Sequence, residues 1–95
     1  MSYFEVDFNE IFYDKNGNAE VRLSLTDKKT DKDGNQILLY EGMLISVFEP
    51  DIDADGQRDN LIASGVVTKF TAEHIPHGQW CCKIDENGIR HESDL

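Results

Sequence analysis

Three consecutive segments decide the fold: Gly42-Met-Leu-Ile-Ser-Val-Phe-Glu49, Pro50-Asp-Ile-Asp-Ala-Asp-Gly-Gln-Arg-Asp-Asn60, and Leu61-Ile-Ala-Ser-Gly-Val-Val-Thr-Lys-Phe70. The first and third are apolar runs of strand length, and the acidic segment between them has the aspartates and glycine of a turn. Strands this apolar are stable only when other parts of the chain cover them. The sequence therefore predicts two central strands around which the rest of the chain is arranged.

The remaining residues predict more antiparallel strands. Four dipeptides tolerate the positive φ angles of tight hairpin turns: Asn16-Gly17, Asp33-Gly34, Asp55-Gly56 and Asn87-Gly88. Apolar and polar residues alternate between them, which is typical of half-buried strands. We expect strands over 3–13, 19–26, 36–49, 61–70, 79–85 and 89–92, with a charged loop over 27–35 and another loop over 71–78. We therefore predict an all-β fold.

The alternation also predicts the core. Trp80, Cys82 and Ile84 fall on one face of their strand, and we expect them to point inward together with Phe4, Val6 and Phe8. Cys81 should then point outward. A disulfide between these adjacent cysteines would be strained, so both should be reduced thiols.

Size and charge limit the function. The 95 residues form one domain, with 9 basic and 19 acidic residues and a formal net charge of −10. Residues 1–40 carry 8 acids and 5 bases, and residues 41–95 carry 11 acids and 4 bases. Such a field repels phosphate backbones and anionic membranes, so we expect neither nucleic acid nor membrane as a partner.

The chain also has no apolar run of the roughly 20 residues that span a bilayer. Acids stand in the N-terminal segment where a signal peptide has basic and then apolar residues. We expect a cytoplasmic protein.

Residues 41–95 resemble the small SH3-like barrels of the Tudor and KOW type. The resemblance lies in the segment after Gly42, in Leu61-Ile-Ala-Ser-Gly-Val-Val67, and in the final stretch from Trp80 through Asn87-Gly88 to Leu95. It implies an antiparallel barrel over 41–95, to which residues 1–40 add an N-terminal hairpin. It also implies binding of peptides or nucleic acids through loop residues. An open β-sandwich is the alternative fold.

The acidic turn invites a calcium interpretation. Asp51, Asp53 and Asp55 with Gly56 match the first half of a calcium-binding loop. The second half does not match, because Ile62 stands where a bidentate glutamate would close the shell. A weak calcium site and a solvated turn remain the two hypotheses. Crowding of these acids with Asp59 should raise at least one carboxyl pKa.

Other chemistry has little support in the sequence. His74, His77 and His91 with the two cysteines would be zinc ligands only at unusual spacings. A thiolate pair of Cys81 with a histidine is disfavoured, because neighbouring acids raise a thiol pKa. An enzyme is therefore the less favoured hypothesis.

The tyrosines supply the preferred functional hypothesis. Tyr3, Tyr13 and Tyr40 are the aromatic residues most suited to reach the surface, and an exposed aromatic side chain rimmed by acids suits a basic peptide. We expect a non-catalytic binding or accessory module with a protein partner, a possibly basic one, and no cofactor. Tyr13 and Tyr40 are the candidate partner-binding residues.

Overall fold

The computed structural model describes residues 2–13, 16–72 and 75–94, and for residues 70–72 and 75–78 it describes the backbone alone. The described part has two 3-10 turns, η1 (Phe8–Glu10) and η2 (Glu92–Asp94), and every other regular element in it is a strand. The strands are β1 (Ser2–Glu5), β2 (Ile11–Tyr13), β3 (Ala19–Ser24), β4 (Lys28–Thr30), β5 (Gln36–Leu38), β6 (Leu44–Glu49), β7 (Leu61–Ala72), β8 (Ile75–Ile84) and β9 (Arg90–His91). The all-β prediction is confirmed.

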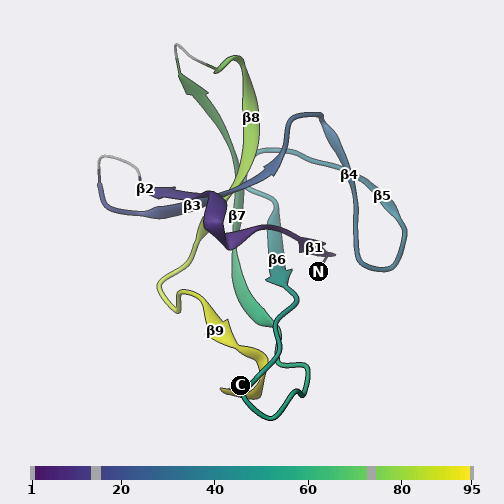
Figure 1. The fold of residues 1–95 in the computed structure, drawn as a ribbon. Helices are drawn as coiled ribbons and strands as arrows, with labels where there is room; N and C mark the ends of the chain where they lie inside the picture. Colours follow the sequence, from purple (N-terminus) through teal and green to yellow (C-terminus); the bar gives the residue numbers. More distant parts are fainter. Residues whose placement is uncertain (1, 14–15, 73–74, 95) are drawn as a thin grey trace.

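One twisted sheet holds most strands in the order β1-β6-β7-β8-β3-β2, with β9 paired to the start of β7. The predicted central strands are β6 and β7, and they pair antiparallel from Leu44 opposite Val66 to Glu49 opposite Leu61. The acidic segment joins them at the end of the molecule where the C-terminus also lies (Figure 1). Among the described residues β1 and β2 end the sheet and do not pair with each other.

The N-terminal strands belong to this sheet and are not an addition to it. A single strand was expected over 3–13, but η1 divides it. β1 pairs with β6 in parallel, whereas β2 forms a hairpin with β3, and β3 pairs with β8. The Asp7 side chain starts η1 by accepting a hydrogen bond from the Asn9 N–H. This turn redirects the chain from one edge of the sheet to the other.

The charged segment 27–35 is more ordered than expected. Its first residues form β4, which pairs with β5 in a separate two-stranded sheet. The hairpin carries Lys28, Lys29 and Lys32, and it extends beside β1 (Figure 1). The main chain fastens it there, because the Lys32 N–H donates to the Tyr3 carbonyl oxygen at 2.9 Å. The hairpin therefore covers part of the open edge of β1.

The core lies on one face of the main sheet. Alternate residues of β1, β3, β6, β7 and β8 point into it, as the period of two requires. Its buried members are Phe4, Val6, Val21, Leu23, Leu39, Ile45, Val47, Ala63, Val67, Cys82 and Ile84. The inward positions predicted for Phe4, Val6, Cys82 and Ile84 are confirmed, and Phe8 packs against the cluster while partly exposed.

Trp80 is less buried than expected. It packs against the core but keeps part of its ring exposed, and its Nε1–H donates to Asp27 Oδ1 at 2.9 Å. The Lys69 ammonium lies 5.2 Å from the centroid of the Trp80 ring. The register between β3 and β8 shifts next to Trp80, between Arg22 and Ser24. Trp80 lies opposite Lys69 in the pairing of β7 with β8, at the margin of the core.

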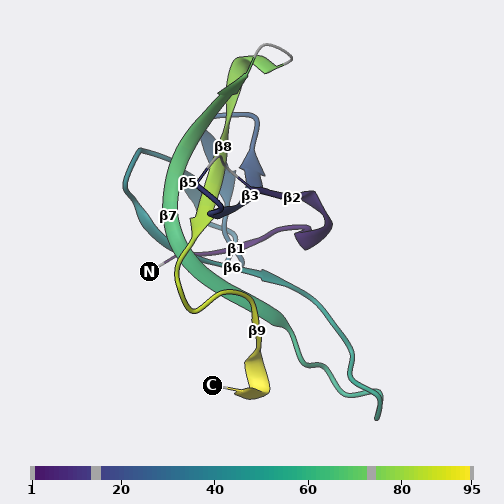
Figure 2. The same ribbon diagram turned by 90° about the vertical axis from the view of Figure 1, so that its left-hand side faces the viewer.

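The end of β7 and the start of β8 replace a predicted loop. The segment 71–78 was expected to be irregular around Pro76, but β7 continues to Ala72 and β8 begins at Ile75. Both strands are long and curved (Figure 2). Residues 73 and 74, within the predicted loop, lie outside the described residues.

The last strand pairs differently from the prediction. A hairpin across Asn87-Gly88 was expected to place residues 89–92 beside the preceding strand. Instead β9 pairs with Leu61 and Ile62 at the start of β7. This pairing brings the C-terminal turn η2 next to the acidic segment. In the part of the chain that the structure describes, no helix has the length and apolar character needed to cross a membrane.

Candidate functional site

A hollow of about 170 Å³ lies on the outer face of the sheet, opposite the core. We call it the Tyr3 hollow. Six side chains from five parts of the chain line it: Tyr3, Lys32, Phe48, Asn60, Ile62 and Glu92. Ligand pockets for small molecules typically measure about 300–1,000 Å³. The hollow therefore suits one amino-acid side chain better than a cofactor.

Strand register places its apolar floor. Tyr3 lies opposite Ser46 in the parallel pair, and Phe48 lies opposite Ile62 in the antiparallel pair. Tyr3 and Phe48 share a face because Phe4 and Val47, their neighbours in sequence, point into the core. The outer face would otherwise be expected to be polar, so three apolar side chains together are a distinctive feature of it.

A lysine lies over the aromatic ring of the hollow. Lys32 Nζ is 5.0 Å from the centroid of the Tyr3 ring, within the range of a cation–π interaction. The Lys32 main chain is held by the hydrogen bond to the Tyr3 carbonyl oxygen, but its side chain is exposed. A cation is thus already placed on the ring by the chain itself.

The opposite wall supplies acceptors. Glu92 is exposed, and its N–H donates to the Asn60 carbonyl oxygen at 2.8 Å. The side-chain Oδ1 of Asn60 is buried and has no hydrogen-bond partner among the described residues. Buried acceptors are nearly always paired, because an unpaired one costs about 1–3 kcal/mol. The exposed Glu92 carboxylate is the acceptor that a donor-bearing ligand can reach at this wall.

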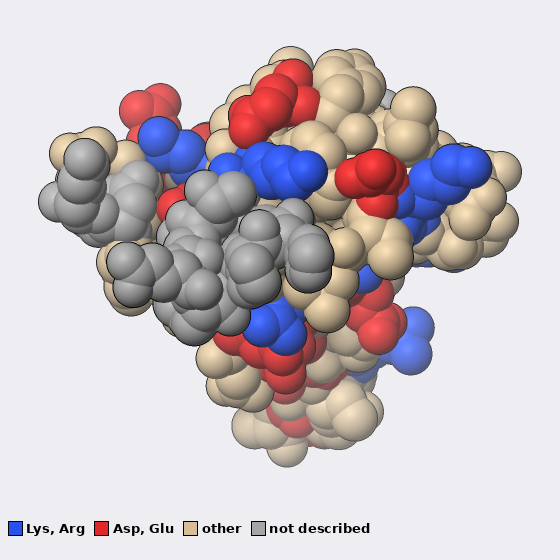
Figure 3. Space-filling view, turned by 90° about the horizontal axis from the view of Figure 1, so that it is seen from above, with Lys and Arg blue, Asp and Glu red and all other residues tan. Residues whose placement is uncertain are grey.

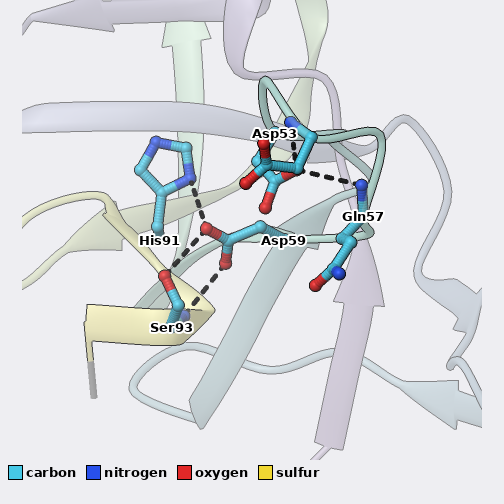
Figure 4. A network of polar contacts seen from close by, with 6 residues as sticks. Asp53, Gln57, Asp59, His91 and Ser93 are labelled. Atoms are coloured by element: carbon cyan, nitrogen blue, oxygen red, sulfur yellow. Dashed lines mark hydrogen bonds and ion pairs between the residues drawn. The ribbon is translucent and has the colours of Figure 1, made fainter.

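A carboxylate clasp holds this wall together (Figure 4). Asp59 accepts two hydrogen bonds from Ser93, at 2.9 Å from its N–H and at 2.8 Å from its hydroxyl. His91 Nδ1 lies 3.6 Å from the same carboxylate. The acid therefore stands between the serine and the histidine, whereas a catalytic triad needs the histidine between the other two. The arrangement fixes the C-terminal turn and does not activate the serine.

The clasp predicts an acid-dependent stability. Hydrogen bonds from the Ser93 N–H and hydroxyl, with a smaller effect of His91, lower the pKa of Asp59 below its usual 3.8. A lowered folded-state pKa means that the stabilisation is complete above the unfolded-state value and is lost as the pH falls through the folded-state value. We expect Ser93→Ala to move the Asp59 pKa back toward 3.8, as measured by carboxyl NMR titration.

A second test of the clasp is the urea concentration at the midpoint of unfolding. Below about pH 4, this midpoint should depend less on pH in Asp59→Asn than in the wild type. Asp55→Asn, at an exposed acid of the same segment, should leave it nearly unchanged. An Asp59 pKa that Ser93→Ala does not raise would contradict the clasp. At Asp59 itself the hydrogen bonds from Ser93 lower the pKa. The expectation that crowding raises at least one carboxyl pKa in this segment stays a prediction.

The three candidate calcium ligands lie in a short hairpin. Its arms meet at a bridge between Ile52 and Arg58, and the Asp59 N–H donates to the Asp51 carbonyl oxygen. At the tip, Asp53 Oδ1 accepts from the N–H groups of Asp55 and Gln57, both at 2.9 Å. Gly56 follows at φ +80°, which favours glycine. This carboxylate therefore serves the turn itself.

The same turn occurs in two other places. Asp31 Oδ1 accepts from the N–H groups of Asp33 and Asn35, and Gly34 has φ +87°. Asp85 Oδ1 accepts from the Asn87 N–H ahead of Gly88. The match of this segment to a calcium-binding loop thus follows from a turn pattern that recurs in this chain. In residues 2–13, 16–72 and 75–94, no three His, Cys, Asp or Glu side chains are grouped as a metal ion would require. The calcium site stays a prediction from the sequence.

Asp53 separates the two hypotheses for the loop. Asp53→Asn keeps an oxygen that accepts both N–H groups, so the free energy of unfolding should change little. Asp53→Ala removes it and should cost about 1 kcal/mol, as for loss of a capping side chain. We expect no change in the wild-type melting temperature at millimolar calcium. A calcium-induced rise that Asp53→Asn with Asp55→Asn abolishes would show a cation site instead.

The two candidate partner-binding tyrosines are exposed but are in different parts of the fold. Tyr13 ends the outer strand β2 and has 70% of its surface exposed, and Tyr40 follows β5 with 59% exposed. Neither lines the Tyr3 hollow. Tyr3 itself is 38% exposed and is the tyrosine that lies in a concave site.

The adjacent cysteines are both buried, so the expectation that Cys81 points to solvent is wrong. Cys81 lies on the outer face, where Gln79 and Glu20 are also buried, and Arg22 Nε–H donates to Gln79 Oε1 at 3.0 Å. Burial, followed by the charge of Glu20, raises the pKa of Cys81 to about 12, and burial raises that of Cys82 to about 12. Both thiols stay protonated at neutral pH and are poor nucleophiles.

Of the histidines, His91 belongs to the clasp. His74 lies outside the described residues, and the side chain of His77 lies outside them too, so the zinc hypothesis falls on residues that the structure does not describe.

On the face seen from above in Figure 3, acidic and basic side chains lie side by side. The excess of acidic over basic side chains is at the other end of the molecule. Residues 49–62 and 89–95 carry seven acids against two arginines there (Figure 1).

Sequence reasoning missed five of the six residues around the hollow. Phe48 and Ile62 lie in apolar runs without clear alternation, so their face could not be assigned. Lys32, Asn60 and Glu92 lie in turns and join the site through long-range hydrogen bonds. The one available signal was Tyr3, an aromatic residue on the polar phase of its strand.

The comparisons with known proteins give no family. No protein-family model matches this chain, and no curated protein or solved structure matches it either. A proposal for its function therefore rests on its own residues.

Proposed function

We propose that this protein is a non-catalytic binding module that accepts a side chain of a partner protein in the Tyr3 hollow. The observation that carries the proposal is the hollow itself, where three apolar side chains form the floor and charged side chains stand at the rim. Protein interfaces combine an apolar centre with a polar rim in this way, and tyrosine is enriched at their energetic centres.

The size of the hollow supports a protein partner over a small molecule. A volume of about 170 Å³ is below the usual range for cofactor and drug-sized ligands but leaves room for one side chain. Anchor side chains that fill small pockets dominate many protein interfaces. The site is also formed by strands and by two hydrogen-bonded turns, so little ordering is required on binding.

We also propose that the fold is a distant variant of the SH3-like barrel. Three features favour it: β6, β7 and β8 pair consecutively as antiparallel neighbours, β7 is curved (Figure 2) and contains a glycine, Gly65, and a short 3-10 turn follows the last strand. A solution structure in which the free edges of β1 and β2 approach each other would support closure into a barrel. Separation of these edges would favour the open sheet.

Photo-crosslinking in the source cell tests the binding site. A benzoylphenylalanine probe replaces Glu5, whose exposed side chain shares the face of Tyr3 and lies opposite Phe48 in the strand pair, and matched probes replace Tyr13 and Tyr40 on other surfaces. We expect one protein to be crosslinked from position 5 and not from positions 13 or 40. Crosslinks from Tyr13 or Tyr40 alone would place the binding surface elsewhere and overturn the proposal.

The purified partner then gives an affinity test. Glu92→Lys reverses the charge at the rim and should weaken binding about tenfold or more, with the stability of the module unchanged. Glu86→Lys changes the net charge equally at an exposed turn that is outside the hollow. If the two variants weaken binding equally, the effect is one of overall charge and the hollow is not the site.

A further inference from the structure

We propose that the side chain accepted by the Tyr3 hollow is cationic, an arginine or a lysine of the partner, and that it replaces Lys32 on the Tyr3 ring. This inference rests on the proposed function and names the chemistry of the ligand. Lys32 then acts as an internal occupant that every partner has to displace.

The position of Lys32 is the first support. Its ammonium lies 5.0 Å from the Tyr3 ring centroid, so the face of the ring already accommodates a positive charge. The two parts of the residue differ in freedom. The main chain is fixed by its hydrogen bond to Tyr3, whereas the side chain is exposed and can leave the ring by rotation. Displacement therefore needs no movement of the β4–β5 hairpin.

The acceptors are the second support. Arginine and lysine side chains carry donors only, and the lining of the hollow offers the exposed Glu92 carboxylate as an acceptor. A carboxylate or phosphate ligand would bring a second anion beside Glu92. A hydrogen bond from a cation to this charged acceptor is the favourable alternative.

The charge around the hollow is the third support. The end of the molecule built from residues 49–62 and 89–95 carries seven acids and two arginines, and this end forms one wall of the hollow. Such a field attracts cationic groups and repels anionic ones. It therefore favours a basic side chain over the neutral ones that the apolar floor alone would also admit.

A peptide titration followed by NMR tests the inference. The probes are acetyl-Gly-Arg-Gly-amide, its lysine analogue, and its citrulline analogue, which keeps the shape of arginine without the charge. We expect the arginine and lysine probes to shift the signals of Tyr3, Phe48, Ile62 and Glu92. The citrulline probe should bind several-fold more weakly.

The internal competitor gives the sharper readout. Lys32→Gln should raise the affinity for the arginine probe about two- to five-fold, because the cation–π contact no longer has to be broken. Lys28→Gln is the matched control, since it removes the same charge from the same hairpin without contact to Tyr3. We expect it to raise the affinity much less.

Two outcomes would overturn the inference. The first is equal binding of the arginine and citrulline probes, and the second is an equal gain from Lys32→Gln and Lys28→Gln. Neither outcome affects the crosslinking result from position 5. A partner crosslinked there that the arginine probe does not displace would leave the binding site standing and exclude a cationic anchor. The absence of any position-5 crosslink would instead refute the proposed function itself.

Discussion

Gly65→Ala should unfold most of this protein or bring it close to unfolding. Gly65 lies in the middle of β7, opposite Ile45 on one side and Ile84 on the other. A Cβ atom placed there would lie 2.0 Å from the main-chain oxygen of Lys83 and 3.0 Å from Cys82 Sγ. Contacts to main-chain atoms are relieved only by moving the strand. We expect a loss of about 3 kcal/mol or more, at or above the upper end for overpacking.

The double variant Gly65→Ala with Cys82→Ala identifies the clashing group. It removes the sulfur but leaves the Lys83 carbonyl group in place, so it should be no more stable than Gly65→Ala alone. Urea unfolding measures both values. If Cys82→Ala restores the stability, the sulfur is the obstacle and the strands at Gly65 are further apart than described.

Phe4→Ala should be the most damaging truncation of the core, with a cost of about 3–5 kcal/mol. The ring is fully buried, and its strand β1 is held to the rest of the sheet by pairing with β6 alone among the described strands. Native domains are stable by only about 5–15 kcal/mol in total. Loss of Phe4 should therefore also release β1 and, with it, the Tyr3 side of the hollow.

Trp80→Ala provides the comparison. The indole is larger than a phenyl ring but lies at the margin of the core, with its N–H bonded to Asp27 in an exposed position. Trp80→Ala should lower the free energy of unfolding by less than Phe4→Ala does, with a difference of roughly 1 kcal/mol or more, because less apolar surface is lost from the interior. Phe4→Leu, which keeps most of the volume, should cost less than about 1.5 kcal/mol. A Trp80→Ala loss equal to that of Phe4→Ala would mean that the indole belongs to the core after all.

The turns could be predicted from the sequence because their causes are local. Asp53 bonds to N–H groups two and four residues ahead, and Gly56 supplies the positive φ angle that follows. These atoms are close in the chain whatever the rest of the fold does. The same local chemistry explains why the acidic segment resembles half of a calcium loop.

The inward face of the strands could also be predicted, since alternation in β1 and β8 depends only on the pleat of each strand. Prediction failed at Trp80 and Cys81, where neighbours in space decide the outcome. Trp80 lies opposite Lys69 and donates to Asp27 in an exposed position at the margin of the core. The buried Gln79 and Glu20 accompany Cys81 on a face that the alternation assigns to solvent.

The sequence by itself thus determined the strand-rich class, the positions of the turns and most of the inward residues, because these follow from side-chain alternation and from hydrogen bonds that span a few residues. Only the tertiary structure decided which strands pair. The parallel pairing of β1 with β6 and the return of β9 to β7 join residues 28–43 positions apart. Nothing in either partner's local sequence specifies the other, since long-range pairing is selected by the total surface buried. The Tyr3 hollow exists only through those two pairings, which bring Tyr3 and Glu92 to the same side of the sheet.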